Sequence, residues 1–201
     1  MILLALIVVG GLFIAGLAIW IALEMGPIEF LRRGPPPDGT RWSLYAHHLG
    51  DYMHRWILRH PWGTLRLHHI LRSDEDRHLH DHPFDFTSLL LTGGYVEITH
   101  GEMLLNGQPI LVPLQRTWPR FSIVHKRAEE SHRLVLTRPV WTFVVSGPKR
   151  RSWGFHTEQG WVNHRDYLHL YPEVVAARVG PEGHKAALEI DSQRRARGEK
   201  P

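Results

Sequence analysis

Three histidines stand at alternate positions in the segment RHLHDHPFDF, namely His78, His80 and His82. Side chains two residues apart on a β-strand point to the same face, so an unbroken strand would direct these imidazoles into one cavity. Neutral imidazole binds first-row metals such as Fe, Zn, Ni, Cu and Mn, and a neighbouring strand can supply the third ligand of such a site. The spacing therefore favours metal binding. The alternative is that these histidines are solvated at the end of a strand.

His132 is the best third ligand in the sequence, because it opens the apolar segment HRLVL directly after a charged stretch. The chain has 16 histidines and no cysteine, which excludes disulfides, thiolate metal sites and cysteine nucleophiles. We therefore predict a metal centre formed by His80, His82 and His132. We expect His78 at the rim of this centre, where it could contact a substrate and orient or protonate it.

From about residue 62, apolar and polar residues alternate in short segments, as they do in β-strands. These strands must position the candidate ligands. Gly, Pro and Asn residues such as Asn106-Gly107 separate the strands. The expected strands are residues 64–71, 84–91, 95–99, 109–113, 121–124, 132–136 and 140–145. Strands of this length and spacing indicate an antiparallel sandwich or barrel. Residues 41–60 differ, because their aromatic and aliphatic side chains have mixed helical spacing, which predicts one or two short amphipathic helices.

The segment LHDHPFDFTSLLLTGGYVE resembles the first motif of the cupin-type small proteins of bacteria and phages, and HRLVL, WTFVVSGPKRRSWGF and Gly160-Trp161 extend the resemblance. It covers roughly residues 62–167. The resemblance implies an all-β fold, a cupin-type antiparallel jelly-roll barrel with short flanking helices. It also implies that His80 and His82 form the H-x-H pair, that Gly93 or Gly94 is the motif glycine, and that His132 is the later histidine.

One position departs from the family pattern. The acidic ligand that usually follows the pair would fall at Phe86 or Thr87, whereas Asp85 stands one place early. Asp85 could be a fourth ligand only if Pro83 introduces a bulge. Without it, three histidines would leave open coordination positions, which suits catalysis or ligand exchange.

A basic segment follows the last predicted strand. Lys149, Arg150 and Arg151 precede Trp153, and together they could clamp an anionic small-molecule ligand beside a stacking ring. The alternative is a solvated basic turn over a tryptophan that plugs the barrel. Arg133, next to a candidate ligand, has the same two interpretations.

The first 23 residues contain no charged side chain, and at about 1.5 Å per residue they are long enough to cross a hydrocarbon core of about 30 Å. They predict a single N-terminal transmembrane helix, residues 1–25, with a cleaved signal peptide as the alternative. Arg32 and Arg33 follow the span and no Lys or Arg precedes it, so the positive-inside rule places the rest of the chain in the cytoplasm.

The remaining chain divides into three expected parts. Residues 26–40 contain GPPPDG and form a Pro/Gly linker, residues 41–180 form the cupin-like domain, and residues 181–201 form a charged C-terminal tail. From about Asp191 the tail lacks apolar residues, so we expect it to have no fixed structure. The excess of 24 Lys and Arg over 20 Asp and Glu is too small to indicate nucleic-acid binding.

Three classes of function remain after other catalytic motifs are excluded, since the sequence has no G-x-S-x-G elbow, P-loop, dinucleotide-binding glycines or H-E-x-x-H helix. The first is a cupin-type enzyme, a mononuclear Fe(II) dioxygenase or hydroxylase, with Zn, Mn or Ni as other candidate ions. The second is a non-catalytic sensor or store for a metal or small ligand. The third is an accessory subunit that meets other transmembrane subunits in the bilayer.

Overall fold

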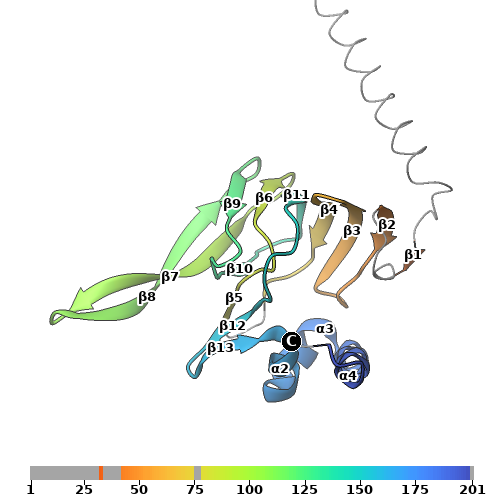
Figure 1. Ribbon diagram of the computed structural model, residues 1–201. Helices are drawn as coiled ribbons and strands as arrows, with labels where there is room; N and C mark the ends of the chain where they lie inside the picture. The colour runs from red at the N-terminus through yellow and green to blue at the C-terminus, as the bar shows by residue number, and fades with distance from the viewer. Residues whose placement is uncertain (1–31, 34–41, 75–77, 200–201) are drawn as a thin grey trace, which may run out of the picture.

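The computed structural model in Figure 1 describes residues 32–33, 42–74 and 78–199, and these residues are mostly antiparallel β-strands with helices at the C-terminal end. The strands are β1 (Arg32–Arg33), β2 (Ser43–Ala46), β3 (Met53–His60), β4 (Gly63–Ile70), β5 (Leu79–His80), β6 (Phe86–Leu90), β7 (Tyr95–Leu105), β8 (Gln108–Trp118), β9 (Ile123–Lys126), β10 (Arg133–Val135), β11 (Val140–Ser146), β12 (Gly154–Thr157) and β13 (Gly160–Asn163). The helices are α2 (His164–Leu170), α3 (Pro172–Val179) and α4 (Pro181–Ala196).

The strands form three sheets. The largest has seven strands in the order β1-β2-β3-β4-β11-β6-β9, and two three-stranded sheets have the orders β10-β7-β8 and β13-β12-β5. Every pair is antiparallel except β1 with β2. This arrangement is consistent with the expected cupin-like jelly roll.

Alternation along the strands of the large sheet determines which side chains enter the core. In β11, Val140, Thr142 and Val144 are buried, while their neighbours point to the opposite face. Val140 packs with Leu90 of β6 and with Tyr95 of β7, which belongs to another sheet. The core therefore lies between the sheets, and a one-residue register slip would turn its side chains out of it.

The two longest strands, β7 and β8, extend from the body as an arm (Figure 1). Asn106 and Gly107 connect them with φ angles of 52° and 75°. These positive values are typical of the tight Asn-Gly hairpin turn, which agrees with the turn expected there.

The helices predicted over residues 41–60 are wrong, because the structure has β2 and β3 there. Both faces of β3 carry apolar side chains. Ile57 enters the interior, whereas Trp56 on the opposite face stacks on Trp141 with ring centroids 5.6 Å apart. Because apolar and polar side chains are mixed on both faces of β3, its sequence shows no clear period of two and suggested a helix.

The prediction that the tail has no fixed structure from Asp191 is also wrong, because Asp191 lies within α4. Its carboxylate is buried and accepts hydrogen bonds from Arg165 and, at 2.6 Å, from Arg195 Nε. Burial would raise the pKa of Asp191, but the bonds from Arg195 and Arg165 hold it well below its usual range. The buried ion pair of Arg165 with Asp191 connects α2 to α4.

The predicted transmembrane segment, residues 1–25, lies outside the described residues, as does nearly all of the predicted linker. Among the helices that the structure does describe, none is long and apolar enough to span a bilayer. The anchor and its orientation therefore stay predictions.

Candidate metal centre

The structure brings His80, His82 and His132 together, with one nitrogen from each ring within 4.8 Å of the others. His80 lies on β5, and His132 lies immediately before β10. Two backbone hydrogen bonds join these residues, from His80 N to His132 O at 3.0 Å and from His132 N to His80 O at 2.9 Å. The uncertain part of the sequence prediction was the position of His132, and this antiparallel bridge places it directly opposite the H-x-H pair.

The distance between His82 Nε2 and His132 Nε2 is 2.9 Å. Two imidazole nitrogens at adjacent positions of an octahedral ion would be about 3.0 Å apart, since each lies roughly 2.1 Å from the metal. The observed spacing therefore fits two adjacent ligands of one ion. His80 and His132 are buried, whereas His82 is partly exposed.

Aromatic rings surround the three imidazoles. The Phe86 ring lies 4.8 Å from that of His82, and the Phe155 ring lies 6.0 Å from that of His80. Trp153 is 6.4 Å from His80, and its indole stacks on His164. This apolar shell limits the access of water to the nitrogen atoms.

Glu97 of β7 contacts the histidine cluster, and the sequence interpretation missed it. Its buried Oε1 lies 2.5 Å from His132 Nδ1 and 2.8 Å from Lys126 Nζ, and Oε2 accepts a hydrogen bond from Trp118 Nε1 at 2.9 Å. Burial would raise the pKa of Glu97, but its hydrogen bonds, above all the one from His132, lower it to about 2. An ionised Glu97 that accepts the Nδ1 hydrogen leaves the Nε2 lone pair of His132 directed at the other histidines.

The sequence did contain a signal for Glu97. In YVEIT, a glutamate takes the same face as Tyr95, and both side chains are buried in the structure. A carboxylate at an inward position of an apolar strand needs a polar partner. Asp74 is a second missed residue: its Oδ2 lies 4.0 Å from His80 Nδ1 and accepts a hydrogen bond from Leu134 N at 2.8 Å.

Asp85 does not join the histidines, so its predicted role as a fourth ligand is not supported. Its Oδ1 accepts hydrogen bonds from Ala128 N at 2.7 Å and from Arg150 Nη2 at 2.6 Å. These bonds, that of Arg150 first, lower the pKa of Asp85. The carboxylate connects the loop before β6 to the loop after β9 and is not part of the three-histidine cluster.

His78 is buried and faces the helices, which corrects its expected place at the rim. Its Nδ1 lies 2.9 Å from the Tyr167 hydroxyl, and its Nε2 lies 3.0 Å from Glu158 Oε2. The reason is that β5 contains only Leu79 and His80, so the alternation of an unbroken strand does not reach residue 78.

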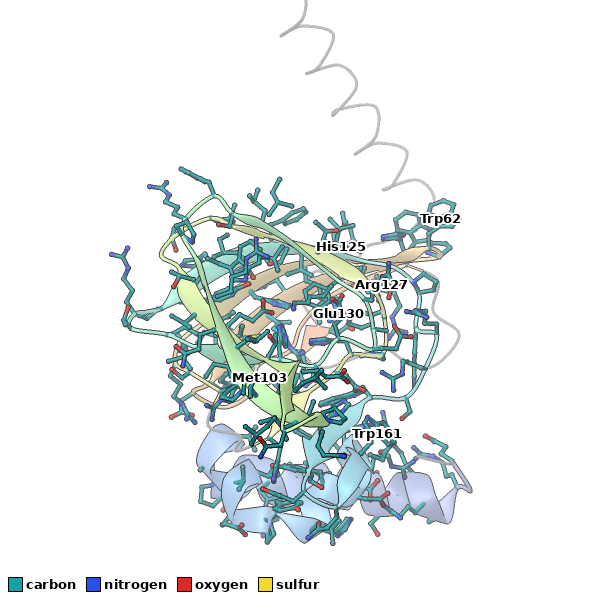
Figure 2. The ribbon with its side chains drawn as sticks, turned by 90° about the vertical axis from the view of Figure 1, so that its left-hand side faces the viewer. Trp62, Met103, His125, Arg127, Glu130 and Trp161 are labelled. Atoms are coloured by element: carbon teal, nitrogen blue, oxygen red, sulfur yellow. The ribbon has the colours of Figure 1, made fainter. Side chains whose placement is uncertain are left out.

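The two arginines of the basic segment pair with carboxylates, and their predicted role in clamping an anionic ligand stays a prediction. Arg150 pairs with Asp85 and Glu129, and Arg151 pairs with the buried Asp81 at 2.7 Å. Asp81 lies between the two metal-site histidines but points away from them, and Trp161 Nε1 also donates to it. Figure 2 shows Trp161 on the side of the molecule next to the helices. These ion pairs connect the loop between β11 and β12 to Asp85 and to Asp81.

Lys149 is exposed, and Arg133 on β10 is partly buried beside His132. Neither residue belongs to the three-histidine cluster. Their predicted contacts with a substrate stay predictions, as does that of Trp153.

Comparisons with known proteins identify no family. No family model matches the chain, and no curated protein matches it. Similar solved structures include the hydroxypropylphosphonic acid epoxidase of S. wedmorenis in complex with fosfomycin, with 14% identity over 56% of this chain and 57% of the epoxidase, and a TM-score of 0.37. The chain thus spans less than two thirds of that enzyme.

Two further solved structures show the same level of similarity. The 7S globulin of Momordica charantia is 10% identical over 75% of this chain and 46% of the globulin, with a TM-score of 0.43. KdgF of Halomonas sp. is 14% identical over 54% of this chain and 86% of KdgF, with a TM-score of 0.35. Similarity at this level does not establish an activity.

Proposed function

We propose that this protein is a cupin-like metal protein that binds one divalent ion through His80, His82 and His132. The observation that carries the proposal is the convergence of the three ring nitrogens within 4.8 Å, with His132 oriented by the buried carboxylate of Glu97. A histidine that donates its other ring nitrogen to a carboxylate is typical of metal ligands, because the carboxylate fixes the ring and makes it more basic.

We propose Fe(II) as the ion, with Zn, Mn and Ni as competitors, and a dioxygenase or hydroxylase reaction on a small molecule. Three imidazoles on one side leave other positions of an octahedral ion accessible. A bound Fe(II) would supply the redox chemistry that dioxygen requires. The chain itself holds the ligands, keeps Glu97 ionised and excludes water with Phe86 and Phe155.

Metal analysis of the purified full-length protein tests this function. We expect about one ion per chain in the wild type and a large loss in His80→Ala and His82→Ala. His125→Ala is the matched control, because His125 is an exposed histidine whose ring lies beside Thr87 Oγ1. Equal metal content in all four proteins would exclude the three-histidine site.

We further propose that residues 1–25 anchor the protein in a membrane by a single span, with the β domain on the cytoplasmic side. The support is the uncharged N-terminal sequence and the position of Arg32 and Arg33 after it. Alkaline carbonate washing of membranes tests the anchor. Recovery of the full-length chain in the wash would contradict it.

A non-catalytic role as an accessory subunit is a second candidate, and the β7–β8 arm favours it. Leu104, Leu111 and Leu114 of this arm are exposed, with 71%, 66% and 51% of their surface accessible. Met103 lies on the same arm, which faces the viewer in Figure 2. Stable co-purification with membrane partners, together with absence of metal, would favour this role over the enzyme.

A further inference from the structure

A second cluster of chemically active side chains lies on the interior face of β3 and β4. The register pairs Arg55 with His68 and Arg59 with Thr64, and Arg66 lies on the same face between them. Ile57, the partner of Arg66, is 3% exposed, which identifies this face as the one that enters the barrel. Three arginines and a histidine therefore share one interior wall.

Two of these arginines, Arg59 and Arg66, form no ion pair with a carboxylate of the described residues. Arg66 donates a 2.7 Å hydrogen bond from Nε to Thr64 Oγ1, and its guanidinium carbon lies 4.2 Å from the centre of the Phe84 ring. Buried arginines normally have an acidic partner, because an unpaired buried charge is costly.

The pKa values on this wall agree with a local excess of positive charge. Burial, followed by the charge of Arg55, lowers the pKa of Arg66 to about 10. Burial, again followed by Arg55, also lowers the pKa of His68 well below its usual value. His47, which contacts Arg55, has its pKa lowered to about 4 by burial and by the same arginine.

Two buried polar atoms on this wall also point to a ligand. His68 Nε2 and Ser43 Oγ are buried and form no hydrogen bond with any described residue. Ser43 is the register partner of Arg59, so its hydroxyl belongs to the same face as the arginines. Native proteins leave few such atoms unsatisfied, and a bound molecule commonly supplies the partner.

We propose that this wall, the arginine wall of Arg55, Arg59, Arg66 and His68, binds an oxyanion, namely a phosphate, phosphonate, sulfate or carboxylate group of a small molecule. The planar guanidinium groups can donate paired hydrogen bonds to such a group. Ser43 Oγ and His68 Nε2 can donate further bonds to it. Thr64 Oγ1 accepts a hydrogen bond from Arg66 Nε and so orients the guanidinium group.

The arginine wall and the histidine cluster are separated by one aromatic ring. The Phe84 ring, which contacts Arg66, stacks near His82 with ring centroids 6.5 Å apart. We infer that the anionic group belongs to the substrate of the metal centre, so that Arg66 holds one end of a molecule whose other end faces His82. This last step rests on the proposed function, whereas anion binding itself does not.

Calorimetric titration of the purified full-length protein with inorganic phosphate tests the site. We expect saturable binding at one site per chain, weakened by at least about tenfold in Arg66→Gln, since a hydrogen bond to a charged group has a strength of that order. Arg66→Lys should bind phosphate with intermediate affinity, because lysine keeps the positive charge but lacks the paired N–H donors of the planar guanidinium group. Arg138→Gln, the same change at an exposed arginine, should bind as the wild type does.

Thermal unfolding separates a ligand site from a structural role. Without phosphate, Arg66→Gln should unfold at the same temperature as the wild type or higher, because it removes repulsion, and phosphate should no longer raise that temperature. If Arg66→Gln does not fold, Arg59→Gln carries the test, with the same expected loss of phosphate affinity. No saturable binding to the wild type, or full affinity in the folded Arg66 or Arg59 variant, would overturn the proposal.

The His132→Ala variant distinguishes the proposed metal site from the proposed oxyanion site. Phosphate affinity should be unchanged in this variant, because His132 lies outside the arginine wall. Phosphate binding in a wild-type protein that binds no metal would retain the oxyanion site and remove the metal function. Metal binding without phosphate, sulfate or malonate binding would do the reverse.

Discussion

The histidine cluster and the arginine wall both place nitrogen-rich side chains inside the barrel, but the protein balances their charge differently. Next to His132, the carboxylate of Glu97 is already present and also pairs with Lys126. Next to Arg66, no described carboxylate is present. The comparison indicates that the first site is prepared for a cation, whose ligands must be neutral and oriented, and that the second is prepared for an anion.

At the histidine cluster, we expect the loss of His132 to reduce metal affinity more than any other change considered. His132→Ala removes a ligand and also leaves Glu97 without its main hydrogen-bond donor, so we expect metal affinity to fall by more than about 100-fold. Metal-binding titration of the full-length protein measures this change. His78→Ala should retain the metal, because His78 contacts Tyr167 and Glu158 instead. Equal losses in the two variants would contradict the assignment.

Loss of the Glu97 charge should have a smaller effect on the same site. Glu97→Gln keeps the size of the side chain but weakens the orientation of His132, so we expect a 10- to 100-fold loss of metal affinity, a range of about that size being usual for such partners. The same titration measures it. An unchanged affinity would show that Glu97 serves only to neutralise Lys126.

Lowering the pH should destabilise the metal-free protein as Glu97 becomes protonated. The pKa of Glu97 is lowered to about 2 in the folded chain, below the value of 4.5 for an unperturbed glutamate. Its ionised form therefore contributes stability that is present above about pH 4.5 and is lost as the pH falls towards 2. Chemical unfolding at a series of pH values measures this loss. Glu97→Gln should lose less stability over that interval, and identical profiles would refute the linkage.

The smallest expected effect comes from giving the arginine wall the carboxylate that it lacks. Ser43→Asp places an acid opposite Arg59, so we expect weaker phosphate binding and an unfolding temperature raised by about 2–4 °C. Calorimetry and thermal unfolding measure the two changes. Ser152→Asp, a change outside the large sheet, is the control. A lower unfolding temperature with unchanged phosphate affinity would contradict the idea that unpaired positive charge on the arginine wall binds the anion.

The sequence predicted the three-histidine cluster better than its surroundings. Alternate spacing identified His80 and His82, and the start of an apolar strand identified His132, because both signals are local. Glu97 acts through a contact between residues 35 positions apart in the sequence, and only the pairing of β7 with β10 brings it to His132. Asp85 failed as a ligand for the same reason, since a distant backbone N–H and Arg150 compete for its carboxylate.

The arginine wall was missed because β3 was interpreted as a helix. Arg55 and Arg59 are four residues apart, a spacing that puts them on one face of either a helix or a strand. On an amphipathic surface helix they would be ordinary solvated residues. Only the pairing of β3 with β4 brings them beside Arg66 and His68. The predicted helix also concealed the interior position of these charges.

Anomalous X-ray diffraction from crystals of the Fe(II)-loaded protein tests the central claim most directly. The account predicts one iron peak at about 2.0–2.2 Å from a ring nitrogen of each of His80, His82 and His132, with Asp85 and His78 outside the coordination sphere. A peak at another site, or no peak beside these three histidines in iron-loaded crystals, would contradict the account.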